Sequence, residues 1–272
     1  MMKSFWKMHG AGNDFILFDD RDLTFPDQDH DLICKIATPK YGVGSEGVIL
    51  IQPSETADFR MRFYNPDGSE VEMCGNGARC VSKLAYEIGA APSEMKFDTV
   101  AGVIAAKILA EEQVELTMTE PKDLKLNGQL ELDGEVLTYH FVNSGVPHVV
   151  IEVDDVDSID LPTMGAAIRY HQEFSPRGTN VNLIEITGTD SLKVRTYERG
   201  VEAETLACGT GMVACGLIAG TLGRVSTPVN ITCASGDVLG VNYRSTDEES
   251  MENVTLTGPA VHVFKGEINI EA

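Results

Sequence analysis

Two stretches, Met73-Cys74-Gly75-Asn76-Gly77 and Ala207-Cys208-Gly209-Thr210-Gly211, repeat the pattern Cys-Gly-x-Gly, once in each half of the chain. Each stretch follows a short acidic segment and leads directly into small and apolar residues with a helical pattern. A cysteine at the start of a helix lies near the positive end of the helix dipole and near backbone N–H groups that the helix leaves unpaired. This position lowers the pKa of a thiol and makes the thiolate available as a base or nucleophile. The repeat therefore predicts two thiols that face each other across one site.

The helices expected after the two motifs, residues 77–88 and 210–222, define two halves of the chain. The second contains no charged residue, and a helix that is apolar on every side is a buried one. In the first, only Arg79, Lys83 and Glu87 are charged, and Gly89 is placed to end it. Two core helices, each surrounded by short strands, predict an α/β (α+β) fold with two similar halves.

Short β-rich runs separated by turn residues account for most of the remaining chain. The expected strands are residues 15–19, 47–52, 59–64, 103–110, 114–119, 149–153, 182–186, 193–197, 229–233 and 254–257. Asn127-Gly128, Asp133-Gly134 and residues 188–190 have the composition of hairpin turns. Two further helices are expected at residues 29–38, with Asp29 as N-cap, and at 158–169.

The chain is expected to cross from the first half to the second near Pro121, which follows a predicted strand. The N-terminal half then comprises residues 1–120 and 260–272, if the β-rich run 261–268 returns to it, and the C-terminal half comprises residues 121–259. A chain that crosses twice ties the two domains together.

Composition limits the class of protein. The 272 residues are 43% hydrophobic and 23% charged, which is typical of a soluble globular protein with a substantial core. A net charge of −21 opposes binding to nucleic acid and to anionic membranes, so neither is an expected partner. The sequence has no apparent secretory signal and no apolar run of membrane-spanning length, which favours a cytoplasmic location.

The six cysteines are expected to be reduced thiols in such a compartment. None forms a Cys-x-x-Cys pair and the six histidines do not cluster with them, so no metal site is expected. Cys34, Cys80, Cys215 and Cys233 are interpreted as ordinary core cysteines. Cys74 and Cys208 are interpreted as functional, because the glycine context occurs at both.

Two thiols at helix N-termini suit the inversion of a stereocentre. A thiolate on one face of a carbon removes its proton and a thiol on the other face delivers one, with no cofactor. The α-proton of an amino acid is weakly acidic, and backbone N–H groups at two helix N-termini would stabilise the charge that spreads into the α-carboxylate. This chemistry indicates an amino acid as the small-molecule substrate.

Four segments of the sequence resemble the signatures of one family, the diaminopimelate epimerases. The opening segment is residues 8–15, Met-His-Gly-Ala-Gly-Asn-Asp-Phe, and the first cysteine segment is residues 65–80. Residues 197–211 resemble the second cysteine motif of the family, and residues 257–264 resemble its C-terminal signature. The resemblance runs in order from residue 7 to about residue 266.

The resemblance implies a cofactor-independent epimerase that interconverts LL- and meso-2,6-diaminopimelate in lysine biosynthesis, which also supplies a peptidoglycan precursor. It implies two pseudo-symmetric halves, each a curled, mainly antiparallel sheet around a central buried helix, with the active site in the cleft between them, and a homodimer. Cys74 and Cys208 would be the acid–base pair. The substrate-binding residues that the resemblance implies are Asn13, Asn65, Gly75, Asn76, Asn180, Glu198, Arg199, Gly209 and Thr210.

Within this set, Gly75, Asn76, Gly209 and Thr210 would hold the reacting end of the substrate, and Glu198 would accept its ammonium group. Arg199 and some of the asparagines would bind the distal end, since an arginine orients a carboxylate as well as attracting it. From the residues alone, Asn13 and Asn65 also fit turns. Glu198 with Arg199 also fits an exposed pair at the end of a strand. His9 and His148 are interpreted as structural.

Two positions depart from the family pattern. Val146 stands where many members carry asparagine, and Gly47 stands where many carry glutamine. Both changes fall on substrate-holding positions. Asn143 or Ser144 is expected to compensate, and an unchanged KM after alanine replacement of both would exclude that.

Three alternatives remain open at this point. A proline-racemase-like enzyme also uses paired cysteines, but its first motif usually has histidine in place of Asn76. A redox protein would join Cys74 and Cys208 in a regulatory disulfide. A dinucleotide-binding module is disfavoured, because neither glycine motif is the full fingerprint.

Overall fold

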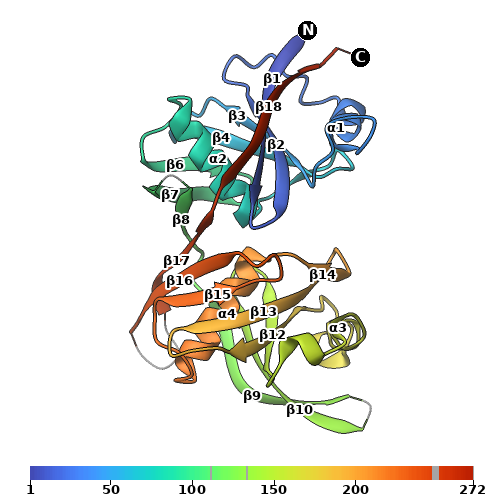
Figure 1. Ribbon diagram of the computed structural model, residues 1–272, viewed down its shortest axis with the longest axis vertical. Helices are drawn as coiled ribbons and strands as arrows, with labels where there is room; N and C mark the ends of the chain where they lie inside the picture. The colour runs from blue at the N-terminus through green and yellow to red at the C-terminus, as the bar shows by residue number, and fades with distance from the viewer. Residues whose placement is uncertain (111, 133, 247–250, 272) are drawn as a thin grey trace. The chain divides into compact units, whose positions relative to one another are not determined.

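The computed structural model describes residues 1–110, 112–132, 134–246 and 251–271 (Figure 1). The chain divides into two compact units. Unit 1 comprises Met1–Leu116 and Gly258–Ala272, and unit 2 comprises Thr117–Thr257. The sequence analysis placed the two crossings at 120/121 and 259/260. Both crossings of the structure lie within strands, β8 (Gln113–Thr117) and β17 (Met251–Pro259).

Unit 1 is built from strands around one long helix. Its strands are β1 (Met2–Gly10), β2 (Asn13–Asp19), β3 (Val48–Gln52), β4 (Phe59–Tyr64), β5 (Glu70–Val71), β6 (Glu94–Thr99), β7 (Gly102–Ala110), β8 and β18 (Val261–Asn269). Its helices are α1 (His30–Ala37) and α2 (Gly75–Glu87).

Unit 2 contains the same kinds of element. Its strands are β9 (Lys122–Leu132), β10 (Glu135–Asn143), β11 (Pro147–Glu152), β12 (Asn180–Ile186), β13 (Ser191–Glu198), β14 (Ala203–Thr205), β15 (Val229–Thr232), β16 (Val238–Ser245) and β17. Its helices are α3 (Leu161–Arg169) and α4 (Gly209–Thr221), with two 3-10 turns, Val156–Ser158 and Gln172–Phe174.

The strands of the two units pair in the same order. In unit 1 the order is β18–β1–β2–β3–β4–β6–β7–β8, with β5 also paired to β4, and only β2–β3 and β4–β6 are parallel. In unit 2 it is β9–β10–β11–β12–β13–β15–β16–β17, with β14 on β13, and only β11–β12 and β13–β15 are parallel. The two halves are therefore pseudo-symmetric and mainly antiparallel, as the sequence predicted.

The helix after each cysteine motif is the core of its unit. In α2, ten consecutive residues from Asn76 to Ala85 are buried, and the helix packs on β1, β2, β3 and β7. In α4, the residues from Gly211 to Ala219 are buried among β10, β11, β12, β13, β15 and β16. The predicted central helices are confirmed, because each buried stretch is long enough to include every side of its helix.

Capping residues set the helix ends where the sequence indicated them. Asp29 caps α1 by accepting a hydrogen bond from the Leu32 N–H at 3.0 Å. Gly89 and Gly223 follow α2 and α4 with φ values of +68° and +69°, the left-handed conformation that ends many helices. The helix expected at 158–169 begins later, at Leu161, because Asp160 caps it and Pro162 occupies its first turn.

The hairpin predicted at Asn127-Gly128 is wrong, because both residues lie inside β9. Asn127 has φ +55°, and the register of β9 against β10 is irregular close by. A Cβ atom on Gly128 would lie 2.5 Å from the ring of Tyr139, so glycine is needed there for the ring to pack. The predicted turn at 188–190 does connect β12 to β13. The other, Asp133-Gly134, includes Asp133, which lies outside the described residues.

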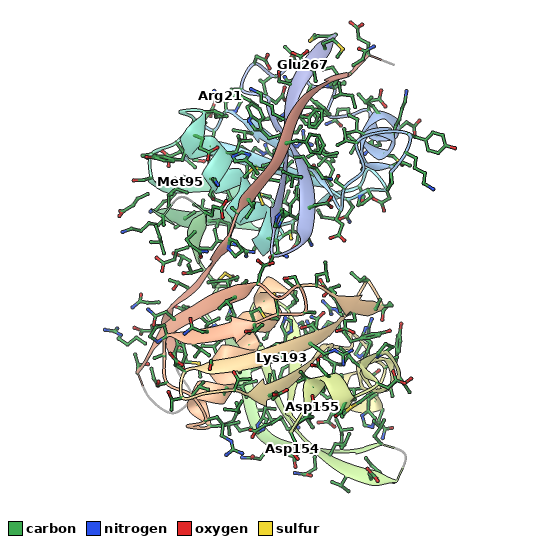
Figure 2. The ribbon with its side chains drawn as sticks, in the orientation of Figure 1. Arg21, Met95, Asp154, Asp155, Lys193 and Glu267 are labelled. Atoms are coloured by element: carbon green, nitrogen blue, oxygen red, sulfur yellow. The ribbon has the colours of Figure 1, made fainter. Side chains whose placement is uncertain are left out.

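The C-terminal strand β18 returns to unit 1, as expected for residues 261–268, and pairs antiparallel with β1. The two chain ends lie side by side in this unit (Figure 1), where the Ile270 N–H donates to the Met1 carbonyl at 2.9 Å. Among the helices of the described residues, none is long and apolar enough to cross a membrane. Asp154 and Asp155, part of the acidic run at residues 154–157, are exposed on unit 2 (Figure 2).

Candidate active site

Both motif cysteines are the N-cap residues of the central helices. Cys74 caps α2 and Cys208 caps α4, each with extended backbone angles. The helical hydrogen-bond ladder begins when the Ala78 N–H donates to the Cys74 carbonyl at 2.8 Å, and when the Met212 N–H donates to the Cys208 carbonyl at 2.9 Å. The N–H groups of the first three residues of each helix therefore lie outside the ladder, which makes each terminus suitable for an anion.

In unit 1 the β1–β2 hairpin lies against the N-terminus of α2. Ala11 and Gly12 form its turn with φ values of +55° and +83°, which suits the twist of a two-residue hairpin. A Cβ atom on Gly10 would lie 2.9 Å from the Asn76 carbonyl oxygen, so glycine allows this close approach. Asn13 pairs with Gly10 across the hairpin. Within the described part of the chain, Asn13 Oδ1 is buried and accepts no hydrogen bond, so it is available to a ligand.

Asn65 lies at the end of β4, in the turn that leads to the first cysteine. Its N–H donates to the Ser69 carbonyl and its carbonyl accepts from the Gly68 N–H, both at 2.9 Å. The turn residue expected from the Asn-Pro-Asp-Gly composition is therefore present. The hydrogen bonds shown here use its backbone, and its side chain is half-buried.

A buried arginine holds the first turn of α2. Arg79 is fully buried, its Nη2 donates to Asn76 Oδ1 at 2.9 Å, and its Nε donates to the Pro259 carbonyl at 3.1 Å. Lys83, one turn further along, donates from Nζ to the Ala260 carbonyl at 3.0 Å. The two cations thus fix the start of α2 to the segment through which the chain re-enters unit 1.

In unit 2, Asn180 joins two turns. Its Nδ2 donates to the Pro147 carbonyl at 2.9 Å and its Oδ1 accepts from the Arg199 N–H at 2.8 Å. The Arg199 side chain donates from Nη1 to the Arg177 carbonyl at 3.3 Å. The structure therefore brings two of the predicted substrate-binding residues, Asn180 and Arg199, into direct contact.

Glu198 ends β13 and lies mostly within the protein. Burial raises the pKa of its carboxyl group above the usual value, although a hydrogen bond from Thr205 Oγ1 at 2.8 Å opposes the shift. A carboxylate in such a place is stabilised by a cation that arrives beside it. This property fits the predicted role of Glu198 as acceptor for a substrate ammonium group.

A hydrogen-bonded chain of side chains reaches Cys208. Thr210 Oγ1 lies 3.6 Å from Cys208 Sγ and 2.9 Å from His148 Nε2. His148 is fully buried, and its other ring nitrogen, Nδ1, lies 3.1 Å from Asn182 Nδ2. The sequence analysis interpreted His148 as structural and did not consider Asn182. The contact between His148 and Asn182 arises from the parallel pairing of β11 and β12, a non-local feature without a sequence signal.

Burial lowers the pKa of His148 to about 3, and the positive charge of Arg199 acts in the same direction. Its usual value of 6.5 applies in the unfolded chain, so the unfolded state binds a proton between pH 6.5 and about 3 and the folded state does not. We therefore expect acidification through this window to destabilise unit 2, by up to about 1.4 kcal/mol per pH unit. Above pH 6.5 the effect of this group vanishes.

Hydrogen exchange of the β11 and β12 amides, followed from pH 7 to pH 4, measures this effect. The variant His148→Gln carries no titrating ring and serves as the comparison. Its opening free energy should fall less with acidification than that of the parent. Equal slopes in the two proteins would contradict the assignment.

The other helix cysteines differ from the motif pair. Burial raises the pKa of Cys80 to about 12 and places that of Cys215 well above its usual value, so both thiols stay protonated. Cys208 is 6% exposed and Cys74 is half-buried. The buried thiols in the middle of the helices are therefore inert, whereas the two thiols at the N-caps lie at helix N-termini.

The structure explains part of the two departures from the family pattern. A Cβ atom on Gly47 would lie 2.3 Å from Phe63 Cε2, and Phe63 packs edge-on against Phe15 at 5.8 Å between ring centroids. A glutamine therefore does not fit at position 47 unless this ring moves. Ser144 is buried and donates from Oγ to the Thr210 carbonyl at 2.8 Å, so it supports the start of α4.

The predicted site residues thus gather at one place in each unit. In unit 1 the residues near the start of α2 are Asn13, Cys74, Gly75 and Asn76, with Asn65 in the turn before the motif. In unit 2 the residues are Asn180, Glu198 and Arg199 at adjoining strand ends and Cys208, Gly209 and Thr210 at the start of α4.

Solved structures share this two-unit fold. A phenazine biosynthesis protein of the PhzF family from Bacillus anthracis superposes with a TM-score of 0.75, with 16% identity and coverage of 99% of each chain. A probable proline racemase from Agrobacterium radiobacter superposes with a TM-score of 0.70, with 16% identity and coverage of 99% of this chain and 93% of that one. The likeness places the chain in a class of proteins that share a two-unit α/β fold.

The sequence identifies the family within this class. The profile of the diaminopimelate epimerase family matches residues 5–124 and 140–263. A diaminopimelate epimerase of Aquifex aeolicus is 42% identical over 278 residues, with 98% of each chain covered. One from Chlorobaculum tepidum is 42% identical over 266 residues, covering 97% of this chain and all of the relative. The chain belongs to the diaminopimelate epimerase family.

Proposed function

We propose that the protein epimerises LL-2,6-diaminopimelate to meso-2,6-diaminopimelate, a step of lysine biosynthesis, with Cys74 and Cys208 as its acid–base pair. The main support for this reaction is the match to the diaminopimelate epimerase family over nearly the whole chain. The position of each cysteine as the N-cap of a central helix supports its role. The proposal includes no pyridoxal phosphate and no metal ion.

The reaction requires two groups on opposite faces of one α-carbon. One sulfur, as thiolate, takes the α-proton, and the electron pair of the broken C–H bond spreads into the adjacent carboxylate. The other sulfur, as thiol, gives its proton to the opposite face and becomes the thiolate. The electron pair returns to the carbon in the new C–H bond, so the configuration is inverted and nothing is consumed.

The helix N-termini would stabilise the charge that develops on the carboxylate. The N–H groups of Gly75 and Asn76 at α2, and of Gly209 and Thr210 at α4, are outside the helical ladders. Donors that are already in place where negative charge forms lower the barrier without reorganisation. The same helix ends favour the thiolate form of the cysteine that caps them.

The remaining residues would hold the substrate. Glu198, whose pKa is raised by burial, would accept the ammonium group at the reacting centre. Asn13 would use its buried Oδ1 to accept from a substrate ammonium group. Arg199, with Asn180 and Asn65, would bind the distal carboxylate and ammonium. The half-buried position of Arg199 and its contact with Asn180 support this assignment.

Conversion in D2O tests the reaction and its mechanism together. Purified protein under reducing conditions, with LL-2,6-diaminopimelate and no added cofactor, is expected to form the meso isomer with one deuterium at the inverted α-carbon. In a two-base mechanism the new hydrogen comes from the second group, which exchanges with solvent. NMR resolves the isomer and the position of the label, and mass spectrometry counts the deuterium.

The same experiment with proline and hydroxyproline is the control for substrate class. Label in proline, with none in diaminopimelate, would contradict the proposed substrate and keep the two-thiol chemistry. An absence of label in every amino acid tested would contradict both. Interconversion of reduced and disulfide forms with a thioredoxin-type reductant, without exchange at carbon, would favour the redox alternative.

We further propose a cytoplasmic homodimer. The cytoplasm is expected because the proposed chemistry needs reduced thiols and the substrate is a biosynthetic intermediate. The dimer rests on the family. Light scattering coupled to size-exclusion chromatography distinguishes a 29.5 kDa chain from its dimer.

A further inference from the structure

The side chain of Asn182 has a fixed orientation inside unit 2. Its Nδ2 lies 2.8 Å from the Val149 carbonyl oxygen, which can only accept a hydrogen bond. Its Oδ1 lies 2.9 Å from the hydroxyl of Thr196, which donates to it. A flipped amide would place two acceptors in contact, so Nδ2 must face Val149. Asn182 is fully buried, so both bonds lie in the protein interior.

This orientation decides where the imidazole of His148 carries its proton. The second hydrogen of Asn182 Nδ2 points to His148 Nδ1 at 3.1 Å, so Nδ1 must accept. A neutral imidazole has one acceptor nitrogen and one N–H, so the proton lies on Nε2. His148 is neutral in the folded protein, because its burial and the nearby charge of Arg199 both oppose protonation.

The Nε2–H of His148 then donates to Thr210 Oγ1 at 2.9 Å. Since this hydroxyl oxygen accepts from the ring, its own hydrogen must point elsewhere, and Cys208 Sγ lies 3.6 Å away. We propose that Asn182 is a positioning residue for Cys208, which acts through the tautomer of His148 to aim the Thr210 hydroxyl hydrogen at the sulfur. No proton moves along this chain, and each bond only sets the direction of the next.

The consequence is selective for the thiolate of Cys208. A hydrogen bond donated to a charged sulfur is stronger than one donated to a thiol, so the chain lowers the pKa of Cys208. If the proton of His148 were on Nδ1, Nε2 would accept from the Thr210 hydroxyl, and that hydroxyl would no longer donate to the sulfur. Any effect of Asn182 on turnover rests on the function proposed above. The tautomer of His148 and the pKa of Cys208 do not depend on that function.

The tautomer can be measured in the unmodified protein. In protein labelled with 15N at histidine, with the His148 signals assigned by comparison with His148→Gln, Nε2 should be protonated and Nδ1 bare from pH 5 to pH 9. A proton on Nδ1 would overturn the proposal without the need for any variant.

The pKa of Cys208 is measured from the pH dependence of its alkylation by iodoacetamide, with peptide mass spectrometry to follow Cys208 in a Cys74→Ala background. The variant Asn182→Leu removes the donor to Nδ1 and keeps a side chain that branches at the same carbon. Its thiolate fraction near pH 7 is expected to fall about tenfold, which is one pKa unit. Thr210→Val, which removes the hydroxyl, should give at least the same fall.

The double variant Asn182→Leu/Thr210→Val separates this chain from a general loss of packing. Because Asn182 acts only through the Thr210 hydroxyl, the double variant should have the thiol pKa of Thr210→Val alone. Additive shifts would overturn the proposal. Thr210→Ser, which restores a hydroxyl, should return the pKa toward that of the parent.

Thr196→Val is the matched control. It removes one hydrogen bond from the same buried asparagine but leaves Nδ2 between Val149 and His148, so the tautomer and the thiol pKa should stay unchanged. A shift as large as that of Asn182→Leu would show that lost packing is the cause, and would overturn the proposal. These measurements use no substrate, so their outcome is independent of whether diaminopimelate is the substrate.

Discussion

Replacing either Cys74 or Cys208 with alanine is expected to lower kcat for LL-2,6-diaminopimelate by about 10³-fold or more, the scale of general acid–base catalysis. Inversion needs a group that removes the proton on one face and a group that delivers one on the other. Loss of either sulfur leaves the reaction without a partner for one of the two steps. The KM should change much less than kcat, because the backbone N–H groups of both helices remain. Steady-state rates of meso formation give both constants.

The same two helices supply matched controls. Cys80→Ala in α2 and Cys215→Ala in α4 remove thiols that are fully buried and whose raised pKa values keep them protonated. Each should keep kcat within the order of magnitude of the parent. Near-normal turnover in Cys74→Ala or in Cys208→Ala would exclude the two-base mechanism. A comparable loss in all four variants would point to damaged folding instead.

The central part of the fold was predictable because its signals are local. A cysteine followed by glycines and a largely apolar run indicates both a helix start and a buried helix. The two helices begin at Gly75 and Gly209, close to the predicted starts at 77 and 210. Predictions from the sequence failed where a contact with a distant part of the chain decides the conformation. Asn127-Gly128 has the composition of a turn, but the ring of Tyr139 on the neighbouring strand needs the space that glycine leaves. Strands β1 and β9 were also not predicted. In β1, two of the buried positions are lysines, Lys3 and Lys7. In β9, the alternating leucines are interrupted by Asn127-Gly128, which has the composition of a turn.

In the candidate site, too, the local features could be predicted from the sequence and the long-range contacts could not. The family signatures drew attention to both cysteines and to the residues beside them, and the helix-cap position of each cysteine follows from the adjacent sequence. The contact of His148 with Asn182 joins residues 34 positions apart through the parallel pair β11–β12, with α3 between them. No pattern in either segment indicates the other. The resemblance also cannot show how Gly47 is accommodated, because the answer lies in the ring of Phe63.

Arg79 is the clearest case of a charged residue whose place the helix pattern does not reveal. It is one of three charged residues on an otherwise apolar helix, and such residues usually face solvent. In the structure it is fully buried, and it donates hydrogen bonds to Asn76 Oδ1 and to the Pro259 carbonyl. The buried guanidinium of Arg79 therefore links the start of α2, next to Cys74, to the segment at Pro259 through which the chain re-enters unit 1.

The variant Arg79→Met is expected to destabilise unit 1 by about 3 kcal/mol, because it removes the donors and leaves buried acceptors unsatisfied. Methionine keeps the length and the apolar stem of the side chain, so the loss reports the guanidinium. Trp6, the only tryptophan, lies in β1 of unit 1 with Lys265 Nζ 4.5 Å from its ring centroid. Its fluorescence during denaturant unfolding therefore follows unit 1 independently of unit 2.

Arg60→Met is the control, because Arg60 is exposed on β4 of the same unit and the variant has the same net charge as Arg79→Met. Its midpoint should match that of the parent within about 0.5 kcal/mol. Arg79→Lys is expected to rescue little, since an ammonium group cannot reproduce two donors in the plane of a guanidinium. Equal midpoints for Arg79→Met and the parent would show that the buried guanidinium is no more stabilising than an apolar side chain of the same length.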